Sequence, residues 1–421
     1  MNSEWRECSL GEVVTLQRGM DLPVQDRKPG EFPVVASTGV VGYHDEAPVK
    51  GPGVVIGRSG SIGGGQYVEC DFWPLNTTLW VKDFKGNDPR FCYYLLRSID
   101  FSGMNAGSGV PTLNRNHLHP MPVVCPDLAE QTRIASLLGA LDDRIALLHE
   151  TNATLEAIAQ VLFKSWFVDF DPVRAKAEGR EPEGLDSETA ALFPDGFEVA
   201  ELGLVPKGWA EATLGRVCDE HGGTIQTGPF GSQLHASDYT RFGIPVVMPK
   251  DIANRRVNEQ SIARIDQAEA DRLARHKVQS GDIVFSRRGD VERHALISIL
   301  ETGWICGTGC LLVRPGSAWP SPTFLSMALD EKRARNWLVR HAVGATMPNL
   351  NTGILADVPI LMPQRDVVAA FENIVKFAEE KRTANYECIN VLAGLRDTLL
   401  PRLISGQIRL PEAEALLEDA A

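Results

Sequence analysis

A repeating apolar seam runs through residues 130–168. Apolar residues and one Asn recur there at alternating steps of four and three: Ile134, Leu138, Leu141, Ile145, Leu148, Asn152, Leu155, Ala159, Leu162 and Trp166. A mean spacing of about 3.5 residues is typical of a coiled-coil helix rather than of an ordinary core helix. At about 1.5 Å per residue, this pattern predicts a rod roughly 57 Å long.

The same rhythm returns in residues 364–405. Its positions are Val367, Phe371, Ile374, Ala378, Lys381, Asn385, Cys388, Leu392, Leu395 and Leu399. A shift of 233 residues carries the first series onto the second and places Asn152 on Asn385. A lone Asn in an apolar seam fixes register and pairing at some loss of stability. The alternative is two unrelated amphipathic helices, each packed on its own domain.

The segments that precede the two helices also correspond. The run that begins with Trp5 matches the run that begins with Trp209, and Arg58 falls on Arg287. Residues 111–114 (Pro-Thr-Leu-Asn) match residues 348–351 (Pro-Asn-Leu-Asn). Short apolar β-type runs bounded by Gly, Pro and Asp predict a strand-rich domain in each copy. The sequence therefore indicates a tandem duplication of the α+β class: domain, helix, domain, helix.

Six segments follow from this comparison. They are a first domain (1–129), a first helix (130–168), an extended acidic connector (169–207), a second domain (208–363), a second helix (364–405) and a fraying tail (406–421). The net charge of −13 argues against a nucleic-acid partner, but much of the acid lies in the connector. Residues 202–363 hold 18 basic and 16 acidic side chains, which leaves room for a local basic face.

Other features bound the class of protein. The eight Cys are scattered without a Cys-x-x-Cys pair, so neither a zinc site nor a disulfide framework is indicated. The N-terminal residues do not read as a signal peptide, and no apolar run reaches membrane-spanning length. We therefore expect a cytoplasmic protein without a membrane partner.

No convincing catalytic motif is present. The sequence lacks a Gly-x-x-x-x-Gly-Lys-Ser/Thr phosphate loop, a His-Glu-x-x-His metal motif and an Asn/Asp-Pro-Pro-aromatic methyltransferase motif. The glycine-rich run 57–65 is better explained as a tight turn between strands. We therefore expect no catalytic residue, bound metal or bound cofactor in this chain.

Polar and basic residues are dense in the predicted loops. Arg suits bidentate contact with guanine or phosphate, and Asn suits adenine. The candidate DNA-binding residues are Arg58, Ser59, Asn114, Arg115, His117, Lys250, Arg255, Arg256, Arg287, Arg288 and Arg293. The alternative for each is an ordinary solvated, salt-bridged surface. Arg58 and Arg287 stand out because they recur at matching places after a predicted strand.

Three stretches carry a family resemblance. They are residues 130–135 (Glu-Gln-Thr-Arg-Ile-Ala), residues 162–180 (beginning Leu-Phe-Lys-Ser-Trp-Phe-Val-Asp-Phe-Asp-Pro) and residues 204–209 (Leu-Val-Pro-Lys-Gly-Trp). With the duplicated halves, the chain resembles the specificity subunit of Type I restriction–modification systems. The resemblance covers essentially the whole chain and is weakest inside the globular domains.

The resemblance implies different roles for the domains, the helices and the partner subunits. Each globular segment would be a target recognition domain that reads one half of a bipartite, asymmetric site in double-stranded DNA. The helices would pair antiparallel, bring Asn152 near Asn385, set the spacing and dock two DNA methyltransferase (modification) subunits. Restriction and translocase subunits would join that core. S-adenosylmethionine, ATP and Mg²⁺ would belong to the bacterial or archaeal partners.

Rival interpretations remain open at this level. One is a recognition subunit of a related system whose modification and cleavage activities are fused in one partner. Another is a coiled-coil scaffold that does not read DNA, and a third is an enzyme with an unrecognised site. Because of its negative charge, we expect the isolated chain to bind DNA weakly and the complex to bind it tightly. The sequence does not indicate the half-site sequences or the gap between them.

Overall fold

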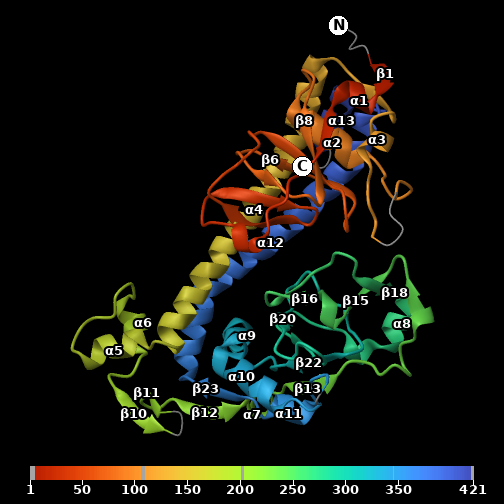
Figure 1. The fold of residues 1–421 in the computed structure, drawn as a ribbon. Coiled ribbons are helices and arrows are strands. Elements are labelled where there is room, and N and C mark those ends of the chain that lie inside the picture. The colour runs from red at the N-terminus through yellow and green to blue at the C-terminus, as the bar shows by residue number, and fades with distance from the viewer. Residues whose placement is uncertain (1–4, 106–109, 201–202, 345, 419–421) are drawn as a thin grey trace. The chain divides into compact units, whose positions relative to one another are not determined.

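The computed structural model describes residues 5–105, 110–200, 203–344 and 346–418 (Figure 1). The chain divides into two compact units, residues 1–148 with 388–421, and residues 149–387. Two helices of 40 residues, α4 (Leu128–Phe167) and α12 (Arg365–Ile404), contribute to both units. In each unit a strand-rich domain lies against paired segments of these helices (Figure 1). The expected α+β class is confirmed.

The first unit contains three sheets. The largest is antiparallel, in the order β2-β8-β5-β6, and a smaller one has the order β4-β3-β7. Their strands are β2 (Thr15–Arg18), β3 (Phe32–Ala36), β4 (Gly39–His44), β5 (Gly53–Gly57), β6 (Gly63–Val68), β7 (Trp73–Pro74) and β8 (Thr78–Asp83). The third sheet pairs β1 (Arg6–Ser9) with β9 (Pro122–Cys125). The helices outside the pair are α1 (Leu10–Val13), α2 (Pro89–Ser98), α3 (Arg115–Leu118) and α13 (Leu410–Glu418), with the short 3₁₀ turn η1 (Val24–Asp26).

The second unit repeats this plan. Its largest sheet has the order β13-β22-β19-β20, and its second sheet has the order β14-β18-β15-β21. The strands are β13 (Thr224–Thr227), β14 (Tyr239–Thr240), β15 (Ile244–Val247), β18 (Ala263–Ile265), β19 (Ile283–Ser286), β20 (His294–Leu296), β21 (Ile305–Cys306) and β22 (Cys310–Arg314). Strand β12 (Ala210–Thr213) pairs with β23 (Pro359–Met362) as β1 pairs with β9. In both large sheets the strand that comes first in the chain lies beside the strand that comes last, which is the topology expected of a duplication.

Further elements complete the second unit. They are a hairpin of β16 (Ile252–Ala253) and β17 (Arg256–Val257), the helices α7 (Leu214–Glu220), α8 (Gln267–Arg272), α9 (Pro322–Asp330), α10 (Lys332–His341) and α11 (Thr352–Ala356), and the 3₁₀ turns η2 (Ala236–Asp238), η3 (Pro249–Asp251) and η4 (Ala274–His276). Helices α2 and α9 occupy matching places and begin alike. The Asp88 and Ser321 side chains accept hydrogen bonds from the backbone amides of Phe91 and Phe324, and each helix has Pro in its first turn.

The apolar seam of α4 is buried as its periodicity predicts. All ten of its seam positions are buried or half-buried. On α12, however, Ile374 and Lys381 are exposed, while Val375 and Arg382 are buried. The sequence assigned those two seam positions one residue too early, because strict alternation of four and three was expected, whereas two steps of four follow one another from Val367 through Phe371 to Val375.

Two predicted segments differ from the structure. The connector is not extended: it forms α5 (Asp171–Ala177), α6 (Ser187–Ala191) and a hairpin of β10 (Phe197–Ala200) and β11 (Gly203–Pro206). Val173 and Phe193 are buried there, and the Phe193 ring lies 4.9 Å from that of Trp166. The predicted tail also folds, because α13 buries Leu410 and Ala413 in the core of the first unit. Both segments carry apolar anchors without a regular period, which is why the sequence pattern missed them.

Candidate nucleic-acid interface

In the first domain, two loops far apart in sequence are joined by their backbones. The loop after β5 carries Arg58, Ser59 and Gly60. Leu113 N donates to Arg58 O at 2.8 Å, and Gly60 N donates to Pro111 O at 3.1 Å. The structure therefore brings Arg58 and Ser59 beside the segment that carries Asn114, as DNA-binding loops would require.

The second domain contains the same pair of loops. Leu350 N donates to Arg287 O at 2.9 Å, and Gly289 N donates to Pro348 O at 3.0 Å. The four residues are those that the duplication places opposite Leu113, Arg58, Gly60 and Pro111. We name each such unit a loop pair: residues 58–60 with 110–114 in the first domain, and residues 287–289 with 347–351 in the second.

The predicted DNA-contact residues on the loop pairs, and on the helix α3 that follows the first pair, are exposed or half-buried. Asn114, Arg115, His117 and Arg288 are exposed, and Ser59, Arg58 and Arg287 are half-buried. Two of the arginines are partly engaged, because Arg58 Nη1 donates to Asn76 O at 3.2 Å and Arg287 Nε to Leu350 O at 3.1 Å. The second contact lies within its own loop pair, whereas the first joins Arg58 to a residue outside it.

Asn114 has a structural role that the sequence analysis missed. Its side chain accepts a hydrogen bond from Asn116 N at 3.0 Å and caps α3. Asn351 caps α11 in the same way, through Ile354 N at 2.8 Å. Asn followed by a short helical run is an ordinary N-cap signal, so the repeated Leu-Asn could have indicated this role.

Lys250 and Arg293 lie outside the loop pairs and are exposed. Lys250 Nζ donates to Ser261 O at 3.1 Å, and Arg293 Nη2 pairs with Asp290 Oδ2 at 2.5 Å. Exposed pairs of this kind contribute little to stability and exchange readily. Their predicted DNA contacts remain predictions.

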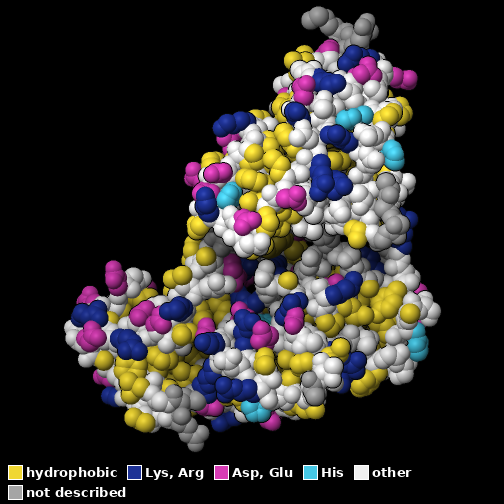
Figure 2. All heavy atoms as spheres, viewed as in Figure 1, with side chains coloured by type: hydrophobic (Ala, Val, Ile, Leu, Met, Phe, Trp, Pro, Cys, Tyr) yellow, Lys and Arg dark blue, Asp and Glu magenta, His cyan; other side chains and the backbone are white. Residues whose placement is uncertain are grey.

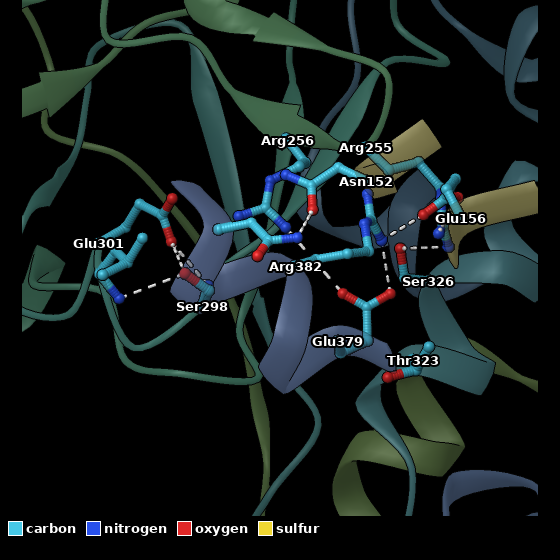
Figure 3. Close-up of polar contacts among 12 residues, drawn as sticks. Asn152, Glu156, Arg255, Arg256, Ser298, Glu301, Thr323, Ser326, Glu379 and Arg382 are labelled. Atoms are coloured by element: carbon cyan, nitrogen blue, oxygen red, sulfur yellow. Dashed lines mark hydrogen bonds and ion pairs between the residues drawn. The ribbon is translucent and has the colours of Figure 1, made fainter. Parts of the chain in front are cut away.

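Arg255 does not serve as the sequence suggests. It lies in the turn between β16 and β17 at a positive φ of 58°, and its side chain is only 8% exposed. Its Nη2 pairs with Glu156 Oε1 of α4 at 2.6 Å, as Figure 3 shows. A buried and already paired guanidinium is not free to bind phosphate, so the predicted DNA contact of Arg255 is wrong. Arg256 likewise faces the helices, with its guanidinium 4.2 Å from the Tyr386 ring centre.

Arg255 belongs to a buried ionic cluster that the sequence analysis missed. Glu156 of α4 contacts both Arg255 and Arg382, and Arg382 Nη1 also pairs with Glu379 Oε1 at 2.6 Å (Figure 3). Burial alone would raise the pKa of Glu156, but the adjacent Arg255 and Arg382 overcome that effect and hold the pKa below its usual value. A charged residue at a seam position, Arg382, was the signal that could have revealed the cluster.

Next to this cluster the two Asn side chains meet. Asn385 Nδ2 donates to Asn152 Oδ1 at 2.8 Å, and both residues are 3% exposed. The contacts Asn152–Asn385, Glu156–Arg382 and Phe163–Phe371 run in opposite directions along the two helices. The helices are therefore antiparallel in this unit, and the predicted contact between the Asn residues is confirmed.

A groove of about 450 Å³ opens beside the ionic cluster. The part of it formed by α12 is rich in carboxylates, including Glu372, Glu379, Glu380 and Glu387. Burial raises the pKa of Glu372, and this effect outweighs the hydrogen bonds from Ser321 and Thr323, which lower it. Carboxylates repel phosphate, so this groove is poorly suited to the DNA backbone and the loop pairs are the better candidates.

The surface charge is mixed. On the face of each unit that Figure 2 shows, basic and acidic side chains alternate over short distances. Among the described residues, no group of three or more His, Cys, Asp and Glu side chains is arranged to hold a metal ion. None of the helices in the described ranges has the length and apolarity needed to cross a membrane.

Comparison with known proteins agrees with this geometry. Residues 2–157 match the family model described as the Type I restriction modification DNA specificity domain. The Type I restriction enzyme HindI specificity subunit of Haemophilus influenzae is 28% identical, over 97% of this chain and 92% of that protein. The MjaIX specificity subunit of Methanocaldococcus jannaschii is 25% identical, over 82% of this chain and 76% of that protein.

The fold also has a solved counterpart. The crystal structure of the Type I restriction–modification system S subunit from M. genitalium superposes with a TM-score of 0.60 at 16% identity, covering 96% of both chains. The solved counterpart shows the fold. One segment of the chain matches the Type I DNA specificity domain, and over most of its length the chain is similar to specificity subunits of Type I restriction enzymes.

Proposed function

We propose that this chain directs a Type I restriction–modification complex to a bipartite, asymmetric site in double-stranded DNA. It is a sequence-recognition subunit without catalytic activity of its own. Each domain reads one half-site, and the paired helices set the distance between the halves. The complex acts in a bacterial or archaeal cytoplasm, where the DNA lies.

The observation that carries this proposal is the repeated loop pair. Two domains place equivalent backbone hydrogen bonds, at Arg58–Leu113 and Arg287–Leu350, beside side chains that differ between the copies and are exposed or half-buried. A fixed backbone with variable side chains is what direct base readout requires. The loops differ in sequence, with Ser59 and Thr112 in one and Arg288 and Asn349 in the other, so the two half-sites are expected to differ.

We further propose that the outer faces of α4 and α12 dock two DNA methyltransferase subunits. In the second unit, α4 exposes Ile158 (58%) and Val161 (69%), and α12 exposes Ile374 (47%) and Phe377 (72%). On each helix the two residues are three apart and share a face. Large exposed apolar side chains at helical spacing are typical of an interaction surface. Restriction and translocase subunits join the complex through this core.

The cofactors belong to the partners in this proposal. The modification subunits supply S-adenosylmethionine for adenine methylation, and the restriction subunits supply the ATP and Mg²⁺ chemistry. This chain binds none of them. Much of the phosphate contact comes from the partners too, because a chain with a net charge of −13 gains little from counterion release.

Adenine-methylation mapping by single-molecule sequencing tests the proposal. Cells carrying this chain with its neighbouring methyltransferase are expected to show a split methylated motif that disappears without the chain. The control pairs the methyltransferase with a chain in which Arg58 and Arg287 are both replaced by Ala. An unchanged methylome on removal of the chain would contradict sequence recognition and favour a scaffold.

A further inference from the structure

Each loop pair exposes one large apolar side chain at the same place. Val110 in the first domain is 57% exposed, and Met347 in the second is 59% exposed. The two positions differ by 237 residues, as do Leu113 and Leu350, and each directly precedes the Pro of its loop pair. Chance exposure of a single apolar residue is common, but exposure at equivalent positions of two diverged copies is not expected from chance alone.

Hydrogen bonds hold the backbone that follows each of these residues. In the first domain, Thr112 Oγ1 donates to Val110 O at 3.0 Å, and Pro111 O accepts from Gly60 N at 3.1 Å. In the second, Pro348 O accepts from Gly289 N at 3.0 Å. Asn349 and Val343 exchange two backbone hydrogen bonds, each of 2.9 Å, across the loop. The apolar side chains are therefore presented on anchored loops.

The surroundings of these side chains are polar. Asn114 and Arg115 are exposed near Val110 in sequence, and Arg288 is exposed on the loop bonded to the segment of Met347. A basic and amide-rich rim suits phosphates and base edges, whereas an apolar tip suits the apolar surface of a base. Such surface is offered by the thymine methyl group in the major groove and by the face of a base at an opened step.

We propose that Val110 and Met347 contact the apolar surface of bases, each in the half-site that its own domain reads. This inference rests on the proposed function and adds a specificity-determining residue to each loop pair. Contact with a base removes one such side chain from water, which favours the complex. Its loss therefore weakens binding roughly tenfold.

The experiment uses the complete methyltransferase complex and duplexes that carry the mapped site. Val110→Ser and Met347→Ser are each compared with the wild type, and Val24→Ser and Ile299→Ser serve as controls because those residues are 73% and 64% exposed off the loop pairs. We expect each loop variant to bind about tenfold more weakly and to lose discrimination between bases in one half-site only. The two variants should affect opposite half-sites.

Two further measurements distinguish contact with the thymine methyl group from contact with the face of a base at an opened step. Uracil in place of thymine removes the methyl group, and 2-aminopurine reports an opened step by its fluorescence. Sensitivity of the wild type to either replacement, absent from the Ser variant, supports the inference. Loss of binding with no response in either measurement, or equal loss at both half-sites, overturns it.

The inference and the proposed function can fail separately. A wild-type complex that recognises no split site contradicts the proposed function. A wild-type complex that recognises one, with loop variants that behave like the two controls, contradicts only the roles of Val110 and Met347.

Discussion

At one set of matching positions, the two copies join their globular domains to the helices with different chemistry. In the first unit the junction is polar: Asp142 of α4 accepts hydrogen bonds from Tyr94 Oη and from Arg396 Nη1 of α12, both at 2.7 Å. In the second unit the junction is aromatic, with Phe163 of α4 packed between Phe324 and Phe371 at ring distances of 5.8 and 6.0 Å.

The exchange is residue for residue. The shift of 233 that aligns the helices carries Asp142 onto Val375 and Tyr94 onto Met327. It also carries Phe163 onto Arg396. An ionic junction and an apolar one thus occupy the same positions of one backbone plan. Well-packed apolar residues can replace a buried ionic group without loss of stability, so duplication leaves such positions free to diverge.

The largest effect is expected in the aromatic junction. Phe163→Ala should reduce the stability of the second unit by about 4 kcal/mol, because Phe163 is 4% exposed and a cavity would remain. The measurement is hydrogen exchange followed by mass spectrometry of the peptides of α9 and α12. Phe163→Leu is the matched control and should lose less stability, because Leu fills more of the cavity than Ala. Equal loss in the two variants would show that packing at this position is unimportant.

The buried ionic cluster should be nearly as sensitive. Glu156→Gln leaves Arg255, which is 8% exposed, without its carboxylate partner, and leaves Arg382, which is 6% exposed, with Glu379 alone; it should cost about 3 kcal/mol. Faster hydrogen exchange in the hairpin of β16 and β17 would report it. The control Glu150→Gln changes an exposed carboxylate on the same helix. A hairpin unaffected by Glu156→Gln would contradict the anchoring role.

The same cluster predicts a pH dependence. The pKa of Glu156 is lower in the folded state than its usual value, so its carboxylate contributes stability that is fully present above the unfolded pKa of about 4.3. That contribution is lost as the pH falls through the folded pKa. The difference in unfolding free energy between wild type and Glu156→Gln should be constant near neutrality and shrink in acid. A difference that grows in acid would reverse the assigned sign.

The polar junction should be weaker. Its side chains are more exposed, with Asp142 at 20% and Arg97 at 27%, so water can replace part of what is lost. Asp142→Asn should reduce the stability of the first unit by about 1.5 kcal/mol, measured by exchange in α2. Glu31→Gln is the control, because Glu31 is an exposed carboxylate of the same unit. A loss as large as that of Phe163→Ala would remove the distinction between the junctions.

The smallest effect is expected from installing one junction in the other copy. The triple variant Asp142→Val, Arg396→Phe and Tyr94→Met gives the first unit the residues of the second. It should unfold within about 1.5 kcal/mol of the wild type, as measured by thermal denaturation. A much larger loss would mean that the two backbones differ more than their shared topology suggests.

The sequence predicted the helices and the duplication because the seam residues recur at regular steps and a constant offset relates the two predicted seams. The seam of α4 followed from its period alone, and the contact of Asn152 with Asn385 followed from the offset together with the antiparallel pairing that the resemblance implied. The partners of Arg255 did not, because its burial depends on a turn of positive φ that packs against α4, a contact between residues 99 positions apart.

The sequence predicted only part of each loop pair. Matching motifs marked Arg58 and Arg287 as special, yet nothing local showed that each loop is bonded to a segment more than 50 residues away. The exposed Val110 and Met347 escaped notice because an apolar residue in sequence is presumed to be buried. Only the structure shows which apolar residues face solvent.

The Asn152–Asn385 contact has a consequence for how such proteins change their targets. Sliding one helix past the other by any small amount would strand two amides among apolar side chains, so intermediate alignments are disfavoured. Only insertion of a whole heptad in both helices restores the pairing, and it lengthens the pair by about 10 Å. On B-form DNA this is about three base pairs. If the helices measure the gap between half-sites, the gap can evolve in steps of that size but not continuously.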